Sequence, residues 1–171
     1  MKQKWIDMYM DIAHRAAQES HGVRLKVGAI FVSLEGVMST GINGLPADSD
    51  NVCEHKEYMD PSAGGWLDPE TIVAQWPYEE DELSVPGAKK RYQLKTKDEV
   101  SHAEENLFAK LMRQGVSTIG GRMFLTHSPC IHCAKIIVGS GVTHVHYYAD
   151  YRSAKGKYWL IKNNIIVVKE E

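Results

Sequence analysis

One histidine and two cysteines stand at spacings that suit a metal ion. His102 is followed two residues later by Glu104, and after a gap of 24 residues the segment Pro129–Cys133 carries Cys130 and Cys133. An imidazole and two thiolates give a tetrahedral zinc three protein ligands and leave its fourth position to water, which is typical of catalytic rather than structural zinc sites. The sequence therefore predicts one catalytic Zn²⁺ per chain.

Glu104 has the chemistry that such a site needs beside the metal. Zinc lowers the pKa of a bound water towards about 7, so hydroxide becomes available at neutral pH. A carboxylate next to that water can take a proton from it and return one to the substrate and its leaving group. The alternatives are a surface histidine with two core cysteines, or a redox Cys-x-x-Cys pair, and the redox pair leaves His102 and Glu104 unexplained.

The apolar pattern around these residues predicts an α/β fold. Residues 5–20 form an amphipathic helix, and strands 27–34 and 36–42 form a hairpin. Helices and strands then alternate: helix 103–114, strand 123–127, helix 130–140, strand 142–148, helix 153–163 and strand 165–169. Parallel strands joined by right-handed crossovers, together with the hairpin, give a three-layer α/β/α sandwich with a mixed five-stranded sheet.

Both sets of metal ligands lie where a helix is predicted to begin. His102 precedes helix 103–114, and Ser128 and Pro129 supply an N-cap and a first-turn proline for the helix that starts at Cys130. The partial positive charge of a helix N-terminus favours thiolates, so this placement suits zinc binding.

An acidic insertion interrupts the regular pattern. From about residue 47 to 100 the apolar rhythm is lost, and residues 51–100 hold 6 Lys and Arg against 11 Asp and Glu. Structureless loops of this length are uncommon unless they are functional or disordered. We therefore expect a single domain over 1–171 with an insertion at about 60–97 that is a lid, an oligomer contact, partly ordered or a solvated excursion.

Composition excludes several classes of protein. The 171 residues include 20 Lys and Arg against 22 Asp and Glu, a net charge of −2, which disfavours a nucleic-acid binder. No apolar run is long enough to cross a membrane and no signal-peptide core follows the N-terminus, so we expect a cytoplasmic protein without membrane contact. Three cysteines make a disulfide framework unlikely and leave Cys53 as a free thiol.

Taken together, the motifs resemble one family, the deoxycytidylate (dCMP) deaminases, including bacteriophage members. His-x-Glu followed by Pro-Cys-x-x-Cys is the signature of zinc nucleobase deaminases in general, and the Gly-x-Asn-Gly-x-Pro segment at 41–46 points to the dCMP branch. The resemblance extends over nearly the whole chain, through 4–10, 26–30, 39–46, 102–104, 126–135 and 149–152. It implies a cytidine deaminase-like fold and hydrolysis of dCMP to dUMP and ammonia, which supplies dUMP for dTTP synthesis.

The resemblance also implies the residues that bind the substrate. They are Asn43, Arg24, Lys26, Ala103, Ser128, Tyr151 and Arg152. A phosphate needs cationic donors, and we favour Arg24, Tyr151 and Arg152 over Lys26, whose direction beside the first strand is not fixed by the pattern. The backbone of 126–128 is expected to read the pyrimidine edge.

Regulation and assembly are implied by the same resemblance. Many relatives are homohexamers that dCTP activates with Mg²⁺ and dTTP inhibits, so we expect a homo-oligomer, specifically a hexamer, with both effectors as partners. The implied effector region includes Gly44, Leu45, Asn51, Glu54 and Tyr58. Some relatives hold a second zinc, but only Cys53 and His55 are close enough in sequence here, and we do not expect one.

Two other functions stay open at this point. The first is a zinc deaminase for another base, such as tRNA adenosine or free cytidine, which the low positive charge disfavours for RNA. The second is an inactive regulatory module that only binds nucleotides, which would have no need of Glu104.

Overall fold

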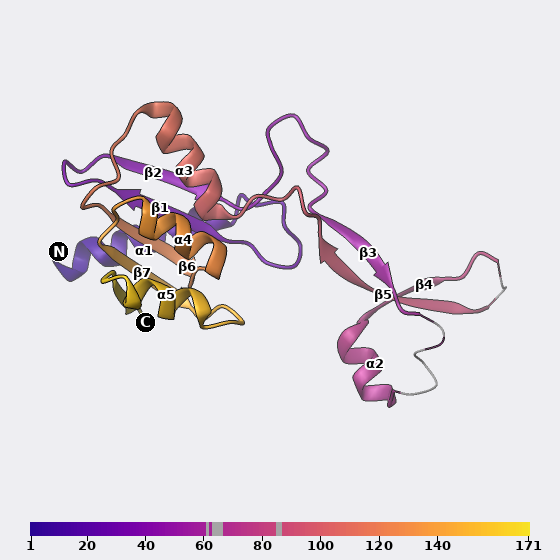
Figure 1. Ribbon diagram of the computed structural model, residues 1–171. Coiled ribbons are helices and arrows are strands. Elements are labelled where there is room, and N and C mark those ends of the chain that lie inside the picture. The colour runs from indigo at the N-terminus through magenta and orange to yellow at the C-terminus, as the bar shows by residue number, and fades with distance from the viewer. Residues whose placement is uncertain (61, 63–66, 85–86) are drawn as a thin grey trace.

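A five-stranded mixed sheet between two layers of helices forms the body of the protein (Figure 1). The computed structural model describes residues 1–60, 62, 67–84 and 87–171. The elements are α1 (Gln3–Ala17), β1 (Gly28–Val32), β2 (Met38–Ile42), β3 (Glu54–Tyr58), α2 (Pro69–Gln75), β4 (Tyr78–Asp81), β5 (Lys89–Thr96), α3 (Ala103–Gln114), β6 (Arg122–His127), α4 (Ile131–Gly139), β7 (His144–Ala149), α5 (Lys155–Lys162) and β8 (Ile166–Lys169). The strand order in the body is β2-β1-β6-β7-β8, which confirms the predicted sandwich.

Burial shows how the layers are assembled. One cluster of buried apolar residues joins β1, β6 and β7 to α3, α4 and α5, and a second joins the opposite face of β1 and β6 to α1. Every residue of β1 is buried because helices cover the sheet on both sides, which explains its uninterrupted apolar sequence. Among the helices in the described part of the chain, none is both long and apolar enough to span a membrane.

The sheet topology brings distant segments to one edge. β6, β7 and β8 run parallel, while β1 is antiparallel to both β2 and β6. The carboxyl ends of β6 and β7 therefore lie beside the start of β1 and the end of β2. The loops next to these strand ends carry most of the predicted site residues. The fold therefore brings these residues together at one edge of the sheet.

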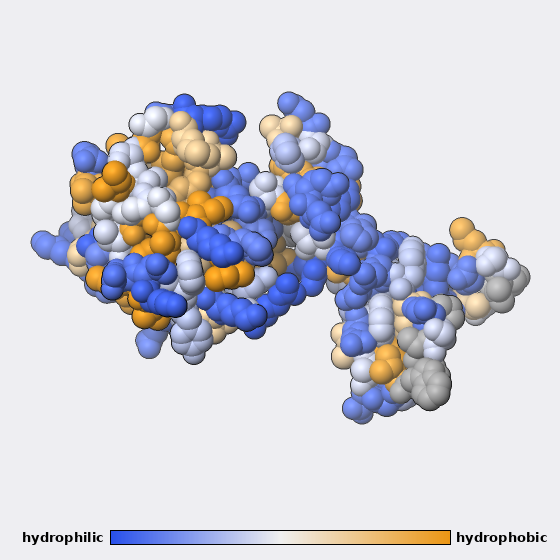
Figure 2. Space-filling model, in the orientation of Figure 1, coloured by the Kyte–Doolittle hydropathy of each residue, from blue (hydrophilic) through white to orange (hydrophobic). Residues whose placement is uncertain are grey.

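The acidic insertion contains more regular structure than its sequence predicts. β3, β5 and β4 form a second, three-stranded antiparallel sheet with α2 beside it, which we call the arm and which projects from the body (Figure 1). Its visible surface is mostly hydrophilic (Figure 2), and no residue of α2 is buried. The arm therefore lacks the apolar face by which strands are normally recognised in a sequence.

Charge pairs and tyrosines take the place of an apolar face in the arm. Acidic side chains of β4 pair with basic ones of β5, as in Glu80 with Lys90 at 3.2 Å. Tyr92 lies between Tyr58 and Tyr78, with ring centroids 5.9 and 5.3 Å away. Exposed ion pairs contribute little individually, about 0–1 kcal/mol, so the arm is held by many small contributions.

Candidate active site

The first metal ligand is held at the start of α3. His102 is the N-cap residue of this helix, and its backbone N–H donates to the Glu105 carboxylate at 2.7 Å. Just before it, Ser101 forms a pair of backbone hydrogen bonds with Gly44, at 3.0 and 3.1 Å. The backbone that carries the imidazole is thereby held on both sides, by its own helix and by the end of the hairpin.

The two cysteines come from the start of α4, and they meet the histidine as predicted. His102 Nδ1 lies 3.3 Å from the sulfur of Cys133 and 3.5 Å from that of Cys130. The three ligand atoms all lie within 4.8 Å of one another. One nitrogen and two soft sulfur donors converging on a point fit a zinc ion with one open position, so the residues present suit the predicted catalytic zinc.

The predicted cap of α4 is wrong by two residues. Cys130, not Ser128, is the N-cap, and its sulfur accepts a hydrogen bond from the Cys133 backbone N–H at 3.5 Å. That bond and the neighbouring Cys133 thiol and His102 imidazole hold the pKa of Cys130 at about 3. A thiolate at this position is the form that binds metal.

Glu104 lies beside the ligands in a nearly closed environment. Its side chain belongs to the first turn of α3 and is only 4% exposed. Burial raises the pKa of its carboxyl group to about 7. A carboxyl group that both gains and loses a proton near neutral pH is suited to general acid and base catalysis.

A glycine allows α5 to approach the ligand-bearing loop. A Cβ atom added at Gly156 would lie 2.0 Å from the carbonyl oxygen of Pro129 and 2.9 Å from backbone atoms of Cys130. These are backbone atoms and cannot move aside without displacing the start of α4. Gly156 therefore sets the distance between α5 and the cysteine loop.

We expect Gly156→Ala to lower the melting temperature by about 3–10 °C and to weaken zinc binding, because overpacking costs about 1–3 kcal/mol. Gly139→Ala is the matched control, since a Cβ there meets nothing within 4 Å. Calorimetry and zinc titration of both variants check the prediction. Equal behaviour of the two would contradict the tight contact.

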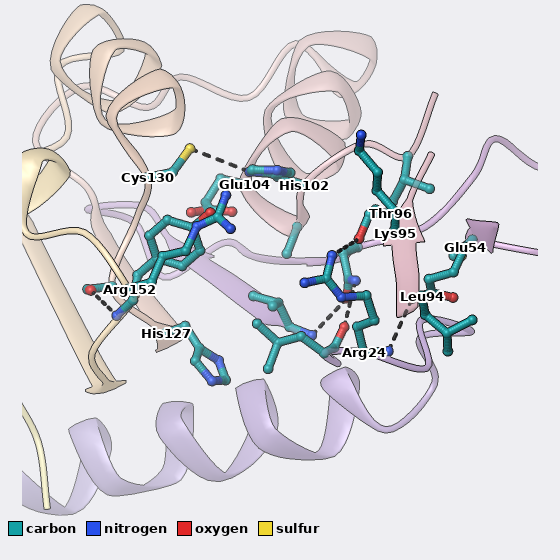
Figure 3. A pocket seen from close by; sticks show the side chains of 18 of the residues that line it. Arg24, Glu54, Leu94, Lys95, Thr96, His102, Glu104, His127, Cys130 and Arg152 are labelled. Atoms are coloured by element: carbon teal, nitrogen blue, oxygen red, sulfur yellow. Dashed lines mark hydrogen bonds between the residues drawn. The ribbon is translucent and has the colours of Figure 1, made fainter. Parts of the chain in front are cut away.

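Two residues of the metal cluster, His102 and Cys130, line together with Glu104 a cleft of about 710 Å³ between the body and the base of the arm (Figure 3). The body contributes six of the seven residues expected to bind substrate, namely Arg24, Asn43, Ala103, Ser128, Tyr151 and Arg152. The seventh, Lys26, is not among the residues that line the cleft, and its ammonium group donates to the Gln18 carbonyl at 3.0 Å.

Two arginines line the cleft, whereas its third cation, Lys95, pairs with Glu57 at 3.0 Å. Figure 3 shows Arg24 and Arg152 on opposite sides of the cleft, with Glu104 between them. In the part of the chain that the structure describes, neither forms an ion pair with a carboxylate, and Arg152 lies over the Tyr151 ring at 5.5 Å. Both guanidinium groups are therefore available to an anion.

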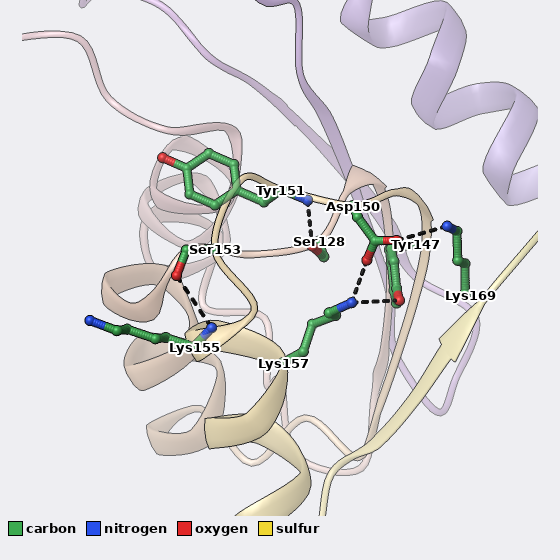
Figure 4. Close-up of polar contacts among 8 residues, drawn as sticks. All are labelled: Ser128, Tyr147, Asp150, Tyr151, Ser153, Lys155, Lys157 and Lys169. Atoms are coloured by element: carbon green, nitrogen blue, oxygen red, sulfur yellow. Dashed lines mark hydrogen bonds and ion pairs between the residues drawn. The ribbon is translucent and has the colours of Figure 1, made fainter.

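The loop after β7 is fixed by polar contacts (Figure 4). Ser128 Oγ accepts a hydrogen bond from the Tyr151 backbone N–H at 2.8 Å. The Asp150 carboxylate accepts from Lys157 and, at 2.7 Å, from Lys169, and these bonds lower its pKa to about 2. Ser128 thus joins the ends of β6 and β7 and positions the residues that follow.

Asn43 holds the backbone on the other side of the cleft. Its Oδ1 accepts from the Val27 N–H at 2.7 Å and its Nδ2 donates to the Leu25 carbonyl at 2.9 Å. One amide hydrogen of Asn43 is left for a ligand. The side chain can therefore both shape the cleft and face its contents.

The five residues of the expected effector region come from the end of the hairpin, the loop that follows it and strand β3 of the arm. Glu54 lines the cleft, Gly44 pairs with Ser101, and Tyr58 lies in the arm, where its hydroxyl donates to Glu80 at 2.7 Å. Leu45 follows Gly44 directly, and Asn51 has a positive φ of 58° in the loop before β3.

Sequence reasoning missed the arm's contribution to the cleft. The part of the arm next to the body lines the cleft with Glu57, Gln93, Leu94, Lys95 and Thr96. The body adds Asp150, which was also not expected. Nothing in the local sequence of β5 could have revealed this, because the contact depends on how the arm is placed against the body.

The site and the fold define a class of protein, the zinc-binding deaminases of nucleobases. Residues 3–149 match the family described as the cytidine and deoxycytidylate deaminase zinc-binding region. The chain belongs to this family, and the resemblance inferred from the motifs is confirmed.

The relatives within this family include bacteriophage proteins. The deoxycytidylate deaminase of Enterobacteria phage T4 is 32% identical, with 85% of this chain and 78% of that protein covered. The deoxycytidylate deaminase of Mycobacterium phage D29 is 30% identical over 84% of this chain and 93% of that protein. The dCMP deaminase of cyanophage S-TIM5, solved in complex with dCMP and dUMP, is 28% identical with a TM-score of 0.73 over 99% of both chains.

Proposed function

We propose that the protein hydrolyses dCMP to dUMP and ammonia. The observation that carries the proposal is a single cleft lined by two of the proposed zinc ligands, His102 and Cys130, and by Glu104. The same cleft holds Arg24 and Arg152, two cations without acidic partners in the described residues. A nucleobase and a phosphate monoester are the two parts of such a substrate. The names of the phage relatives and the ligands of the cyanophage structure support this choice.

The base end of the reaction depends on Glu104. His102, Cys130 and Cys133 would hold a zinc ion, which would supply a water activated for attack on C4 of the cytosine ring. The Glu104 carboxylate takes a proton from this water as the C4–O bond forms and passes it to the base. Glu104 then moves the remaining hydroxyl proton to the amino group, which leaves as ammonia when the C4–N bond breaks and the C4 carbonyl forms, so water and dCMP are converted to dUMP and ammonia without any further reactant.

The other end of the substrate is proposed to lie between the two arginines. Charge-assisted hydrogen bonds from Arg24 and Arg152 bind the phosphate, and the Tyr151 ring supports Arg152. The free amide hydrogen of Asn43 faces the sugar. Ala103, Ser128 and the backbone of 126–128 line the space for the pyrimidine.

Regulation and assembly extend the proposal beyond the catalytic cleft. By the family resemblance, the chain is a single domain that forms a homohexamer, with dCTP and Mg²⁺ as activator and dTTP as inhibitor. Gly44, Leu45, Asn51, Glu54 and Tyr58 are the residues proposed for the effector region. The product dUMP would then enter dTTP synthesis, which explains why dTTP would act as the inhibitor.

The test is a substrate panel read by the loss of cytosine absorbance, on protein of measured mass and zinc content. We expect kcat/KM for dCMP to exceed that for deoxycytidine by roughly a hundredfold or more, because the phosphate adds charge-assisted hydrogen bonds of about 1.5–3 kcal/mol each. Faster turnover of anticodon RNA or of cytidine than of dCMP would favour a deaminase for another substrate. Bound zinc without turnover of any substrate would favour an inactive module. Identical dCMP curves with and without dCTP, Mg²⁺ and dTTP would reject the regulation.

A further inference from the structure

A buried carboxylate joins the arm to the loop that carries Arg24. Glu54 is the first residue of β3 and only 8% exposed, and within the described ranges it has no basic partner. Its Oε1 accepts hydrogen bonds from the backbone N–H of Val23 at 2.9 Å and of Arg24 at 3.1 Å. Burying a carboxylate is costly unless hydrogen bonds compensate, so these two bonds are the reason that it can lie there.

The opposite strand of the arm holds the side chain of the same arginine. Thr96 of β5 pairs with Glu54 in the sheet register. Its hydroxyl accepts from Arg24 Nη1 at 3.4 Å, at the edge of the cleft (Figure 3). The pair of residues at the base of the arm therefore contacts both the backbone and the guanidinium of Arg24.

The loop has few other contacts that could fix this arginine. Residues 23–27 lie between α1 and β1 and belong to neither, and Asn43 holds the following part of the loop at Leu25 and Val27. Arg24 is exposed and lies in no helix or strand. Without Glu54, the backbone of Val23 and Arg24 would lose the two hydrogen bonds that tie it to the arm, one from each residue.

We infer that Glu54 is a positioning residue for phosphate recognition: it holds the Arg24 backbone so that the guanidinium faces the cleft. This inference rests on the proposed function, because it takes the phosphate of the nucleotide as the ligand of Arg24. The Glu54 carboxylate does not itself bind the phosphate, since both are anions. The arm thereby serves as part of the substrate site although it lies outside the catalytic fold.

Kinetics with two substrates test this role. For dCMP we expect Glu54→Ala to raise KM roughly ten- to a hundredfold with little change in kcat, because a charged hydrogen-bond partner of the arginine loop is lost. For deoxycytidine, which lacks the phosphate, kcat/KM of the same variant should fall by less than about threefold. Glu54→Gln keeps an oxygen that can accept from both N–H groups and should restore most of the dCMP activity.

Two further variants complete the design. Arg24→Ala should raise KM for dCMP by a similar factor. Adding Glu54→Ala to Arg24→Ala should raise KM little further, because both changes act on one contact. Glu79→Ala is the matched control, since it removes a carboxylate from β4 that pairs with Arg91 and Lys89 and does not line the cleft. Equal losses for dCMP and deoxycytidine in Glu54→Ala, or full additivity with Arg24→Ala, would overturn the inference.

Amide hydrogen exchange separates this inference from the proposed function. Exchange at Val23 and Arg24 should rise roughly tenfold or more in Glu54→Ala, and not in Glu54→Gln or Glu79→Ala. Unchanged exchange would overturn the positioning role even if the wild-type protein turns over dCMP. If exchange rises in Glu54→Ala but the wild-type protein does not turn over dCMP, the proposed function is rejected and, with it, phosphate as the ligand.

Discussion

Glu104→Gln is expected to lower kcat for dCMP by about a thousandfold while the zinc stays bound. Proton transfer by a positioned side chain contributes typically about 10²–10⁴ in rate. The amide of glutamine has nearly the same shape as the carboxyl group but cannot accept and release a proton at neutral pH. The ligands His102, Cys130 and Cys133 are unchanged, so metal binding should persist.

The measurement joins turnover with zinc content for each preparation. Glu99→Gln is a suitable control, because Glu99 is an exposed carboxylate close in sequence that does not line the cleft. It should retain wild-type turnover. If Glu104→Gln retains turnover with full zinc content, Glu104 does not transfer the proton; if the zinc is lost, its role is structural.

Removal of a metal ligand should have an effect at least as large. We expect Cys130→Ala to lose most of its zinc and more than about a thousandfold in turnover, because the activated water disappears with the metal. Cys130 also caps α4, and loss of an N-cap costs about 0.5–2 kcal/mol. The melting temperature should therefore fall as well.

Zinc content measured by metal analysis provides the comparison with the third cysteine. Cys53 is also buried, at 2% exposure against 9% for Cys130, but it is not part of the metal cluster. Cys53→Ala should keep its zinc. In the wild-type protein a strong chelator should abolish turnover and added Zn²⁺ should restore it. Activity that survives chelation with the zinc removed would contradict the proposed chemistry.

The metal site could be predicted from the sequence because its parts are local. His102 and Glu104 are two residues apart, and Cys130 and Cys133 are three apart at the start of a helix, so each pair is placed by a single turn of chain. The helices and strands of the body could also be predicted, because most of them have either a buried face with a regular apolar period, as in α1, or an uninterrupted apolar run, as in β1. The five-stranded sheet follows from their order.

The details around that site depended on tertiary contacts. Ser128 was expected to cap a helix, but its hydroxyl instead receives the backbone N–H of Tyr151 from the loop after the neighbouring strand. Lys26 turns its ammonium towards the end of α1. Alternative hydrogen-bond partners of a polar side chain can lie far away in the chain, and no local pattern distinguishes between them.

The arm, too, could not be predicted from local sequence patterns. Its strands are rich in charged residues and tyrosines, and cross-strand pairs such as Lys90 with Glu80 hold it together. Such pairs have no period of their own in the sequence. The sequence by itself therefore predicted the residues of the metal cluster, the glutamate proposed as acid and base, and the body of the fold. Only the tertiary structure decided that Glu54 and Thr96 meet Arg24, because polar contacts between distant segments depend on how the sheets are placed in space.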